Sequence, residues 1–214
     1  MAYLTLDMTD VRLRRFAPAA DAISLLYCMR CALCWKPFSY QFRAPNEVAL
    51  IEANRGERDW EEFHRTAFPR RAVELQPVEP SIEPLDDALN RNIELTDNEV
   101  AQYFRLLGRS PEGRISADIR PRSQVGGRPF FQQRFIDPLC PTCVPDVKER
   151  ADFPNKVTAA QKTGRSLEHA GQMYFLASIV NDKTSGIAIY PIDVQVVFFI
   201  CPTCTTITVQ HSVD

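Results

Sequence analysis

FFICPTCTTITVQ, residues 198–210, joins two strand-forming segments through a tight turn that carries two cysteines. The aromatic and β-branched residues on both sides of the turn favour strands. The turn is CPTC, with Cys201 and Cys204 separated by two residues, and the same tetrapeptide occurs earlier, from Cys140 to Cys143. A C-x2-C turn places two sulfur atoms on one side of a loop, so two such turns supply the four ligands of a tetrahedral metal site. We therefore expect one structural Zn2+ held by four thiolates.

The spacing of the cysteines favours metal thiolates over disulfides. All seven lie at C-x2-C spacing: Cys28, Cys31, Cys34, Cys140, Cys143, Cys201 and Cys204. A disulfide-bonded exported domain typically has an even number of cysteines at varied spacings. The N-terminal stretch MAYLTLDMTDVRLRRF lacks the charged-then-apolar order of a signal peptide, and no apolar run approaches the roughly 18 residues of a membrane span. These features predict a cytoplasmic protein that does not enter a membrane.

Other interpretations of the two CPTC turns stay open. The thiols can be buried and reduced, or joined as a disulfide pair, or they can serve redox chemistry, because C-P-x-C occurs in glutaredoxin-type active sites. Redox chemistry needs the first cysteine at a helix N-terminus, where the helix dipole lowers the thiol pKa. The strand-forming TTITVQ after Cys204 excludes that arrangement in the second turn. PDVKERA after Cys143 can form a helix, so redox chemistry at the first turn is only disfavoured.

Cys28, Cys31 and Cys34 offer three ligands without a fourth. The candidate fourth ligands are the histidines: His64, His169 and His211. His64 lies in the same N-terminal part of the chain, but on the apolar face of a predicted helix, where a core position is the commoner role. Either a second zinc is bound there, or one pair of these thiols fills apolar space and the third is free.

The composition of the chain is that of an ordinary globular protein. It has 214 residues, of which 45% are hydrophobic and 24% charged, and its net charge is −2. Without a basic excess, nucleic acid is not the expected main partner. Four prolines lie among acidic and aliphatic residues over 69–84, which predicts an extended run within a proline-rich, acidic connector at 69–95. The connector would separate an N-terminal piece, 1–68, from a C-terminal zinc-ribbon sheet domain, 96–214.

The helices that the sequence predicts are short, and each follows a capping residue. They are 47–55 after Asn46, 60–68 after Asp59, and the helix that follows Thr96 and stops at Gly108, in which Glu99 completes a capping box. Short β-branched or aromatic runs predict strands at 115–120, 129–136, 172–180, 186–190, 193–200 and 205–210, and two more flank the cysteine turns within 24–42. The expected fold class is α+β: an antiparallel sheet with zinc-ribbon knuckles and a few short helices.

The C-terminal half resembles a known family. QVGGRPFFQQ, residues 124–133, is similar to the GG-x-P-x-W-x-Q signature of the YwqG-like bacterial proteins, with Phe131 in place of the tryptophan and Gln133 matching the glutamine. CPTC, the strand MYFLASI and a second cysteine pair follow in the family's order, which programmed cell death protein 2 shares in the grouping called TYPP. The resemblance covers about residues 115–214. Departures are Ala177-Ser178, the non-glycine residues Val144 and Thr205 after the turns, and a charged insertion at 149–169.

The sequence shows no catalytic motif, and a zinc with four thiolates has no open position for a substrate, so we expect no enzyme. The family resemblance implies a protein-binding module: an immunity protein that neutralises a cognate toxin, or a chaperone-like protein that holds a basic client. The acidic stretch 73–99 can cover such a partner, or it can be a solvated linker. Arg128, Phe131 and Gln133 at the Gly-Gly turn are candidate binding residues, although the turn can equally serve the fold alone.

A nucleic-acid-binding zinc ribbon is the alternative function. Six arginines surround the Gly-Gly turn, with Phe130 and Phe131 between them: Arg109, Arg114, Arg120, Arg122, Arg128 and Arg134. Cationic grooves with aromatic side chains suit single strands. The overall acidity of the chain argues against this alternative, and CxxC redox chemistry is the second one.

Overall fold

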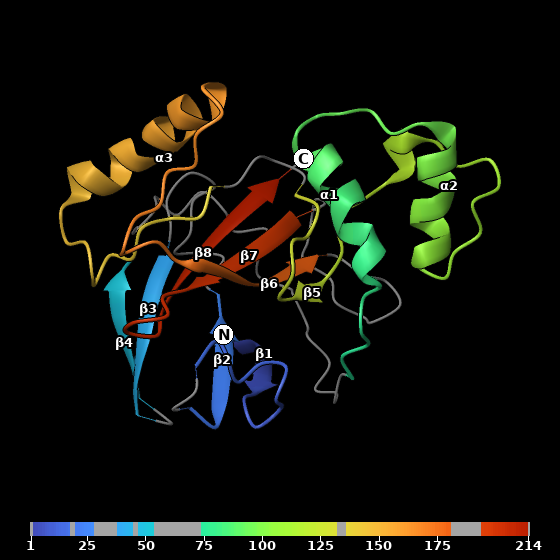
Figure 1. The fold of residues 1–214 in the computed structure, drawn as a ribbon. Helices are drawn as coiled ribbons and strands as arrows, with labels where there is room; N and C mark the ends of the chain where they lie inside the picture. Colours follow the sequence, from blue (N-terminus) through green and yellow to red (C-terminus); the bar gives the residue numbers. More distant parts are fainter. Residues whose placement is uncertain are drawn as a thin grey trace.

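The structure is a computed structural model, and it describes residues 2–17, 20–27, 38–44, 47–53, 74–131, 136–180 and 194–213. It has an α+β fold (Figure 1) with antiparallel sheets and three short α-helices in the described residues. The strands are β1 (Ala2–Asp7), β2 (Ala22–Leu26), β3 (Phe38–Ala44), β4 (Glu47–Glu52), β5 (Gln124–Val125), β6 (Tyr174–Val180), β7 (Val194–Ile200) and β8 (Thr206–Val213). The helices are η2 (Pro80–Ile82), α1 (Glu83–Asn90), α2 (Asp97–Leu106), η3 (Ser116–Asp118) and α3 (Val147–Lys162).

The main sheet has six strands in the order β4-β3-β8-β7-β6-β5, all paired antiparallel. Its centre is the β7–β8 hairpin, in which Ile200 faces Ile207 across the predicted CPTC turn. The strands predicted at 172–180, 193–200 and 205–210 are thus confirmed. β3 pairs with β8, so residues on both sides of the predicted connector share one sheet.

Strand β7 is buried on both faces of the sheet, which explains its unbroken apolar run from Val196 to Ile200. Val196 and Phe198 point toward the core that β1 and β2 cover, whereas Val197 and Phe199 point toward the first cysteine turn. All four side chains are fully buried. Successive residues of a strand alternate between the two faces, so only a strand covered on both sides needs apolar residues at consecutive positions.

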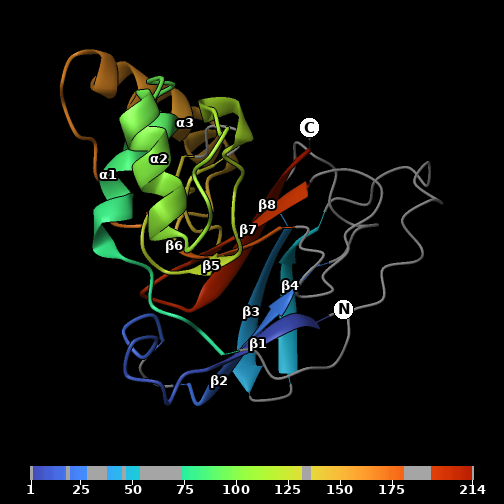
Figure 2. The ribbon, with the colours of Figure 1, turned by 90° about the vertical axis from the view of Figure 1, so that its right-hand side faces the viewer.

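β1 and β2 form a separate antiparallel pair that covers one face of the main sheet. In Figures 1 and 2 this pair lies on the opposite side of the sheet from the three α-helices. The hydroxyl of Tyr40, on β3, joins the two sheets, because it donates to the Ser24 carbonyl at 3.0 Å and accepts from the Leu26 amide at 2.8 Å. Burial raises the pKa of Tyr40. β1 is a strand that the sequence analysis did not predict.

Helices α1 and α2 pack against each other through an apolar cluster of their own, near the β5 end of the sheet (Figure 1). α2 confirms the predicted capping box: the Glu99 carboxylate accepts from the Thr96 amide at 2.8 Å, and the Glu99 amide donates to the Thr96 hydroxyl. α1 lies inside the stretch predicted to be an extended connector, so that prediction was wrong for residues 83–90. Prolines are tolerated in the first turn of a helix, and Pro84 occupies that place in α1.

A buried ion pair holds α1 to α2 and to the segment that contains Arg122. Arg122 donates to both carboxylate oxygens of Asp86, at 3.0 and 2.5 Å, and the Tyr103 hydroxyl donates to the same carboxylate at 2.9 Å. The side chain of Asp86 is fully buried, and that of Arg122 is 14% exposed. Burial raises the pKa of Tyr103.

Two predicted elements are corrected by the structure. Residues 47–52 form strand β4, not a helix, because they pair with β3 at the edge of the sheet. Residues 116–118 form a single 3-10 turn, not part of a strand, because the Asp118 carboxylate accepts from the Ile115 amide at 3.0 Å and closes the chain on itself. The sequence of neither segment shows the contacts with distant parts of the chain that decide between helix, strand and turn.

Other predictions lie partly or wholly outside the described residues. Of the strand predicted at 129–136, the described residues 129–131 are not in a strand, because the Asn90 side chain holds their backbone through Pro129 and Phe131. The helix predicted at 60–68, the strand at 186–190 and the N-cap Asn46 lie outside the described residues. None of the helices in the described part of the chain combines the length and apolar character that a bilayer crossing requires.

Candidate metal centre

The two CPTC turns have the same local structure. In the first, the Val144 amide donates to the Cys140 carbonyl at 2.8 Å, and in the second the Thr205 amide donates to the Cys201 carbonyl at 3.0 Å. Each turn therefore folds its two cysteine side chains toward one side. Thr205 reaches this bond with a φ of +56°, a conformation that glycine adopts more easily.

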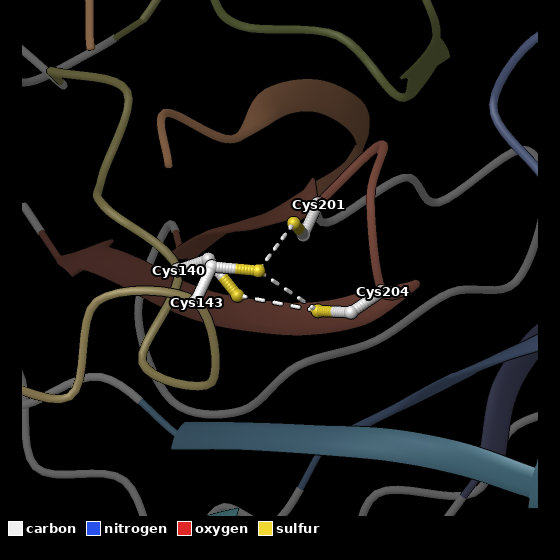
Figure 3. A group of neighbouring side chains, drawn as sticks. All are labelled: Cys140, Cys143, Cys201 and Cys204. Atoms are coloured by element: carbon white, nitrogen blue, oxygen red, sulfur yellow. Dashed lines mark hydrogen bonds between the residues drawn. The ribbon is translucent and has the colours of Figure 1, made fainter. Parts of the chain in front are cut away.

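The four sulfur atoms converge from the two turns (Figure 3). Cys140 Sγ lies 3.5 Å from Cys204 Sγ, and Cys143 Sγ lies 3.6 Å from Cys204 Sγ and 3.7 Å from Cys201 Sγ. All four atoms lie within 4.8 Å of one another. A tetrahedron of thiolates around Zn2+, with Zn–S bonds of about 2.3 Å, has sulfur–sulfur edges of about 3.8 Å. The four cysteines can therefore hold a metal ion.

The same distances argue against disulfides at this site. A disulfide bond joins two sulfur atoms at about 2.05 Å, well below any of the separations above. Among the described residues the four cysteines are free thiols. The other alternative, buried reduced thiols, does not require four sulfur atoms within 4.8 Å of one another, whereas a tetrahedral metal site does.

The environments of the four thiols differ. Cys140 and Cys201 are buried, Cys204 is partly buried and Cys143 is exposed. Burial raises the pKa of Cys140 to about 11, and partial desolvation together with hydrogen bonds to Cys204 and Cys201 raises the pKa of the more exposed Cys143. Burial acts in the same direction on Cys204, but hydrogen bonds from Thr206, Cys140 and Cys143 together outweigh it and lower the pKa to about 7. Four adjacent thiolates repel one another, so a bound cation is what allows all of them to ionise.

Contacts from distant parts of the chain fix both turns. The Cys140 amide donates to the Gly171 carbonyl at 2.8 Å, and a Cβ on Gly171 would lie 2.3 Å from Val144, so only glycine fits there. In the second turn, the Gln41 side chain on β3 donates to the Cys204 carbonyl at 2.7 Å. The N-terminal part of the chain thus contributes directly to the position of a candidate ligand.

Two threonine hydroxyl groups link the turns to each other. Thr206 Oγ1 lies 3.1 Å from Cys204 Sγ and 2.9 Å from Thr142 Oγ1, which belongs to the first turn. Sequence reasoning missed Thr142, Thr206 and Gln41. The available signal was position: Thr142 lies inside the first CPTC turn, and Thr206 follows the second turn by two residues. Gln41 gave no local signal, because it is 163 residues from Cys204.

The remaining metal-ligand candidates do not join this group. His169 Nε2 lies 3.2 Å from a carboxylate oxygen of Glu149, and its Nδ1 accepts from the Gly171 amide. His211 Nδ1 is hydrogen-bonded to the Tyr27 hydroxyl, and burial lowers the pKa of His211 to about 4. Cys28, Cys31, Cys34 and His64 lie outside the described residues, so the second zinc stays a prediction.

The candidate binding residues at the Gly-Gly turn have structural contacts. Arg128 pairs with Asp87 at 3.3 Å, and the Phe131 ring packs edge-on against Phe175, with ring centroids 5.8 Å apart. Gln133 lies outside the described residues. Gly126 and Gly127 have φ values of +67° and +70°, and a Cβ on Gly126 would lie 3.2 Å from the Arg15 side chain. Close approach of the N-terminal segment is thus one reason for glycine at this turn.

Comparison of the chain with protein-family models, with curated proteins and with solved structures finds no match. The resemblance to the YwqG-like proteins therefore stays a prediction that rests on the motifs in the sequence.

Proposed function

We propose that the protein is a non-catalytic, protein-binding module stabilised by a structural zinc at Cys140, Cys143, Cys201 and Cys204. The observation that carries this proposal is the convergence of the four sulfur atoms at 3.5 to 3.7 Å across the three closest pairs between the turns. Four thiolates complete the coordination of Zn2+ and leave no position for a water or substrate. The zinc would therefore stabilise the fold and take no part in a reaction.

Elemental analysis tests the metal. Protein purified under reducing conditions should contain about one zinc per chain if only this site is filled, and about two if the N-terminal cysteines bind a second ion. Iron also accepts four tetrahedral thiolates, but it would colour the protein, whereas zinc absorbs no visible light. Protein free of any stoichiometric metal would contradict the proposal.

The proposed partner is a basic protein: a toxin that this chain neutralises or a client that it holds. The acidic stretch 73–99 supports a basic partner, although part of it is used within the fold, since Asp86 is paired with Arg122, Asp87 with Arg128 and Glu99 with its helix cap. The acidic side chains left exposed are Glu74, Glu79, Glu83, Glu94 and Asp97. Electrostatic attraction of this kind steers association and fixes the choice of partner.

The two alternative functions have less support. Of the arginines around the Gly-Gly turn, Arg122 is committed to a buried ion pair, and Arg114 lies over the Phe104 ring at 5.4 Å. The buried pairing removes Arg122 from the set that could contact a phosphate backbone. Redox chemistry needs a cysteine at a helix N-terminus, but α3 is capped by Asp146, six residues after Cys140.

Charge reversal tests the partner. We expect purification from the native host to retain a basic protein on the unmodified chain, and its recovery to fall at least tenfold for a variant with Glu79→Lys, Glu83→Lys and Glu94→Lys. The matched control reverses three exposed acidic residues elsewhere, Asp21→Lys, Glu47→Lys and Glu168→Lys, and should retain the partner. Equal loss in both variants would indicate a non-specific charge effect. Retention of RNA that is lost steeply with salt would favour the nucleic-acid alternative.

A further inference from the structure

The Thr206 side chain occupies a distinct position beside the candidate metal centre. Thr206 begins β8 and its side chain is completely buried, directly behind the second cysteine turn. Its hydroxyl oxygen lies 3.1 Å from Cys204 Sγ and 2.9 Å from the hydroxyl oxygen of Thr142. Among the described residues, Cys204 is the one of the four cysteines with a side-chain hydroxyl this close to its sulfur. The chain Thr142–Thr206–Cys204 thus links the two turns without any metal.

The number of protons fixes the direction of these hydrogen bonds once a metal is bound. A metal-bound thiolate has no proton and can only accept, so Thr206 must donate its single hydroxyl proton to Cys204 Sγ. The oxygen of Thr206 then accepts from Thr142, whose exposed hydroxyl can donate to it. A hydrogen bond to an ionised acceptor is stronger than one between neutral groups, and burial excludes water that would compete for it.

We propose that Thr206, oriented by Thr142, is a positioning residue of the metal centre: its hydroxyl holds the thiolate of Cys204 in place and slows release of the metal. This inference rests on the metal site proposed above. Groups that hydrogen-bond to metal ligands fix the orientation of the ligand, and their loss typically weakens metal binding by about 10- to 100-fold. Thr206 fits this role because it touches the ligand from one turn and a residue of the other.

Strand β8 offers a matched control at Thr208. Thr208 is also buried, lies two residues further along the same face, and its hydroxyl is hydrogen-bonded at 2.9 Å to Ser39 on β3. Thr206→Val and Thr208→Val each remove one buried hydroxyl and keep the β-branched shape. They should weaken the sheet to a similar degree, but only the first removes a contact with a candidate ligand.

The experiment measures Co2+ and Zn2+ binding to the full chain. We expect Thr206→Val to weaken Zn2+ binding, measured by competition with a chelator, by about 10- to 100-fold, while Thr206→Ser and Thr208→Val stay within about threefold of the unmodified protein. In the Co2+-loaded protein, Thr206→Val should move the thiolate-to-cobalt charge-transfer band to longer wavelength, because the sulfur lone pairs lose a hydrogen bond. Thr208→Val should leave that band unchanged. If Thr206 only stabilised the fold, the two valine variants should have the same spectrum.

The possible failures can be told apart. An unmodified chain that takes up no Co2+ or Zn2+ would overturn the metal site and this inference with it. An unmodified chain that binds tightly, with equal affinities and spectra for the two valine variants, would overturn the role of Thr206 alone. If Thr206→Val does not fold, Thr142→Val changes only an exposed residue, and transfer of zinc to an excess of chelator should then be about threefold faster. An unchanged rate for Thr142→Val would also overturn the inference.

Discussion

The four-thiol cluster and the Asp86–Arg122–Tyr103 cluster are both polar groups enclosed by the fold, but they differ in how their charge is balanced. Arg122 and Asp86 neutralise each other, and Tyr103 adds hydrogen bonds to both partners. The four thiols contain only groups that become negative, so once ionised they need a cation that is not part of the chain. The stability of the four-thiol cluster should therefore depend on the metal available in solution, whereas that of the Asp86–Arg122–Tyr103 cluster depends on the chain alone.

Metal removal should produce the largest effect and should act on one region first. Zinc binding to four thiolates contributes on the order of 10 kcal/mol to folding, so a strong chelator or Cys201→Ser should lower the melting temperature markedly. We expect hydrogen exchange to accelerate first in the two turns and at the β7–β8 end near Ile200, and later in α2. Thr203→Ser, inside the same turn, is the control. Equal acceleration in α2 and in the turns would show that the two regions do not differ in this way.

The part of the metal centre that the sequence predicted is the part that local patterns determine. Cysteines two residues apart fix the shape of each turn, and the strand-forming residues around Cys201 and Cys204 fix the hairpin. The contact of Gln41 with Cys204 could not be predicted, since it depends on β3 pairing with β8. Asp86 and Arg122 are 36 residues apart, and nothing in their local sequence distinguishes them from exposed charges.

The wrong predictions have the same physical cause. EVALIE contains good helix formers, but pairing with β3 outweighs this preference and makes it the edge strand β4. The acidic and proline-rich composition of 69–95 predicted a connector, and it concealed an amphipathic helix whose buried side includes Leu85 and Asp86. Sequence patterns resolve the structure of a turn better than they resolve which distant segments meet.

Breaking the buried ion pair should have the second-largest effect. Asp86→Ala leaves Arg122 charged and largely enclosed, which typically costs about 3 to 5 kcal/mol, and the value here should be near the lower limit because Arg122 is 14% exposed. Urea unfolding measures the change, and the zinc content should stay the same. A fall in zinc content would show that the two regions are coupled.

An apolar replacement sharpens the contrast between the regions. Combining Asp86→Leu, Arg122→Met and Tyr103→Phe removes every charge and hydroxyl of the cluster together, and such replacements are often neutral or stabilising. We expect the free energy of unfolding to recover to within about 1 kcal/mol of the unmodified protein. No similar replacement exists for the four thiols, because their contribution would come from the proposed cation.

Lowering the pH should destabilise the protein through a third buried polar contact, between Tyr27 and His211, which belongs to neither cluster. Burial lowers the pKa of His211 from 6.5 to about 4, so the unfolded chain binds a proton more readily than the folded one. Stability from this group is complete above pH 6.5 and is lost as the pH falls toward 4, by about 2 kcal/mol at pH 5. His211→Gln should remove that loss. The difference in the free energy of unfolding between the two proteins at each pH cancels any effect of metal that they share. A difference that does not change with pH would contradict the prediction.

The smallest effect is expected one residue from the buried pair. Asp87 pairs with Arg128 at 3.3 Å, but these side chains are 33% and 72% exposed, so water and salt screen the attraction. A double-mutant cycle with Asp87→Asn and Arg128→Gln should give a coupling of about 0.5 kcal/mol that disappears in 1 M salt. Asp86 and Asp87 are neighbours in α1, so helix propensity and position are nearly the same for both. A coupling as large as the cost of Asp86→Ala would mean that enclosure from water is not what separates strong from weak ion pairs in this fold.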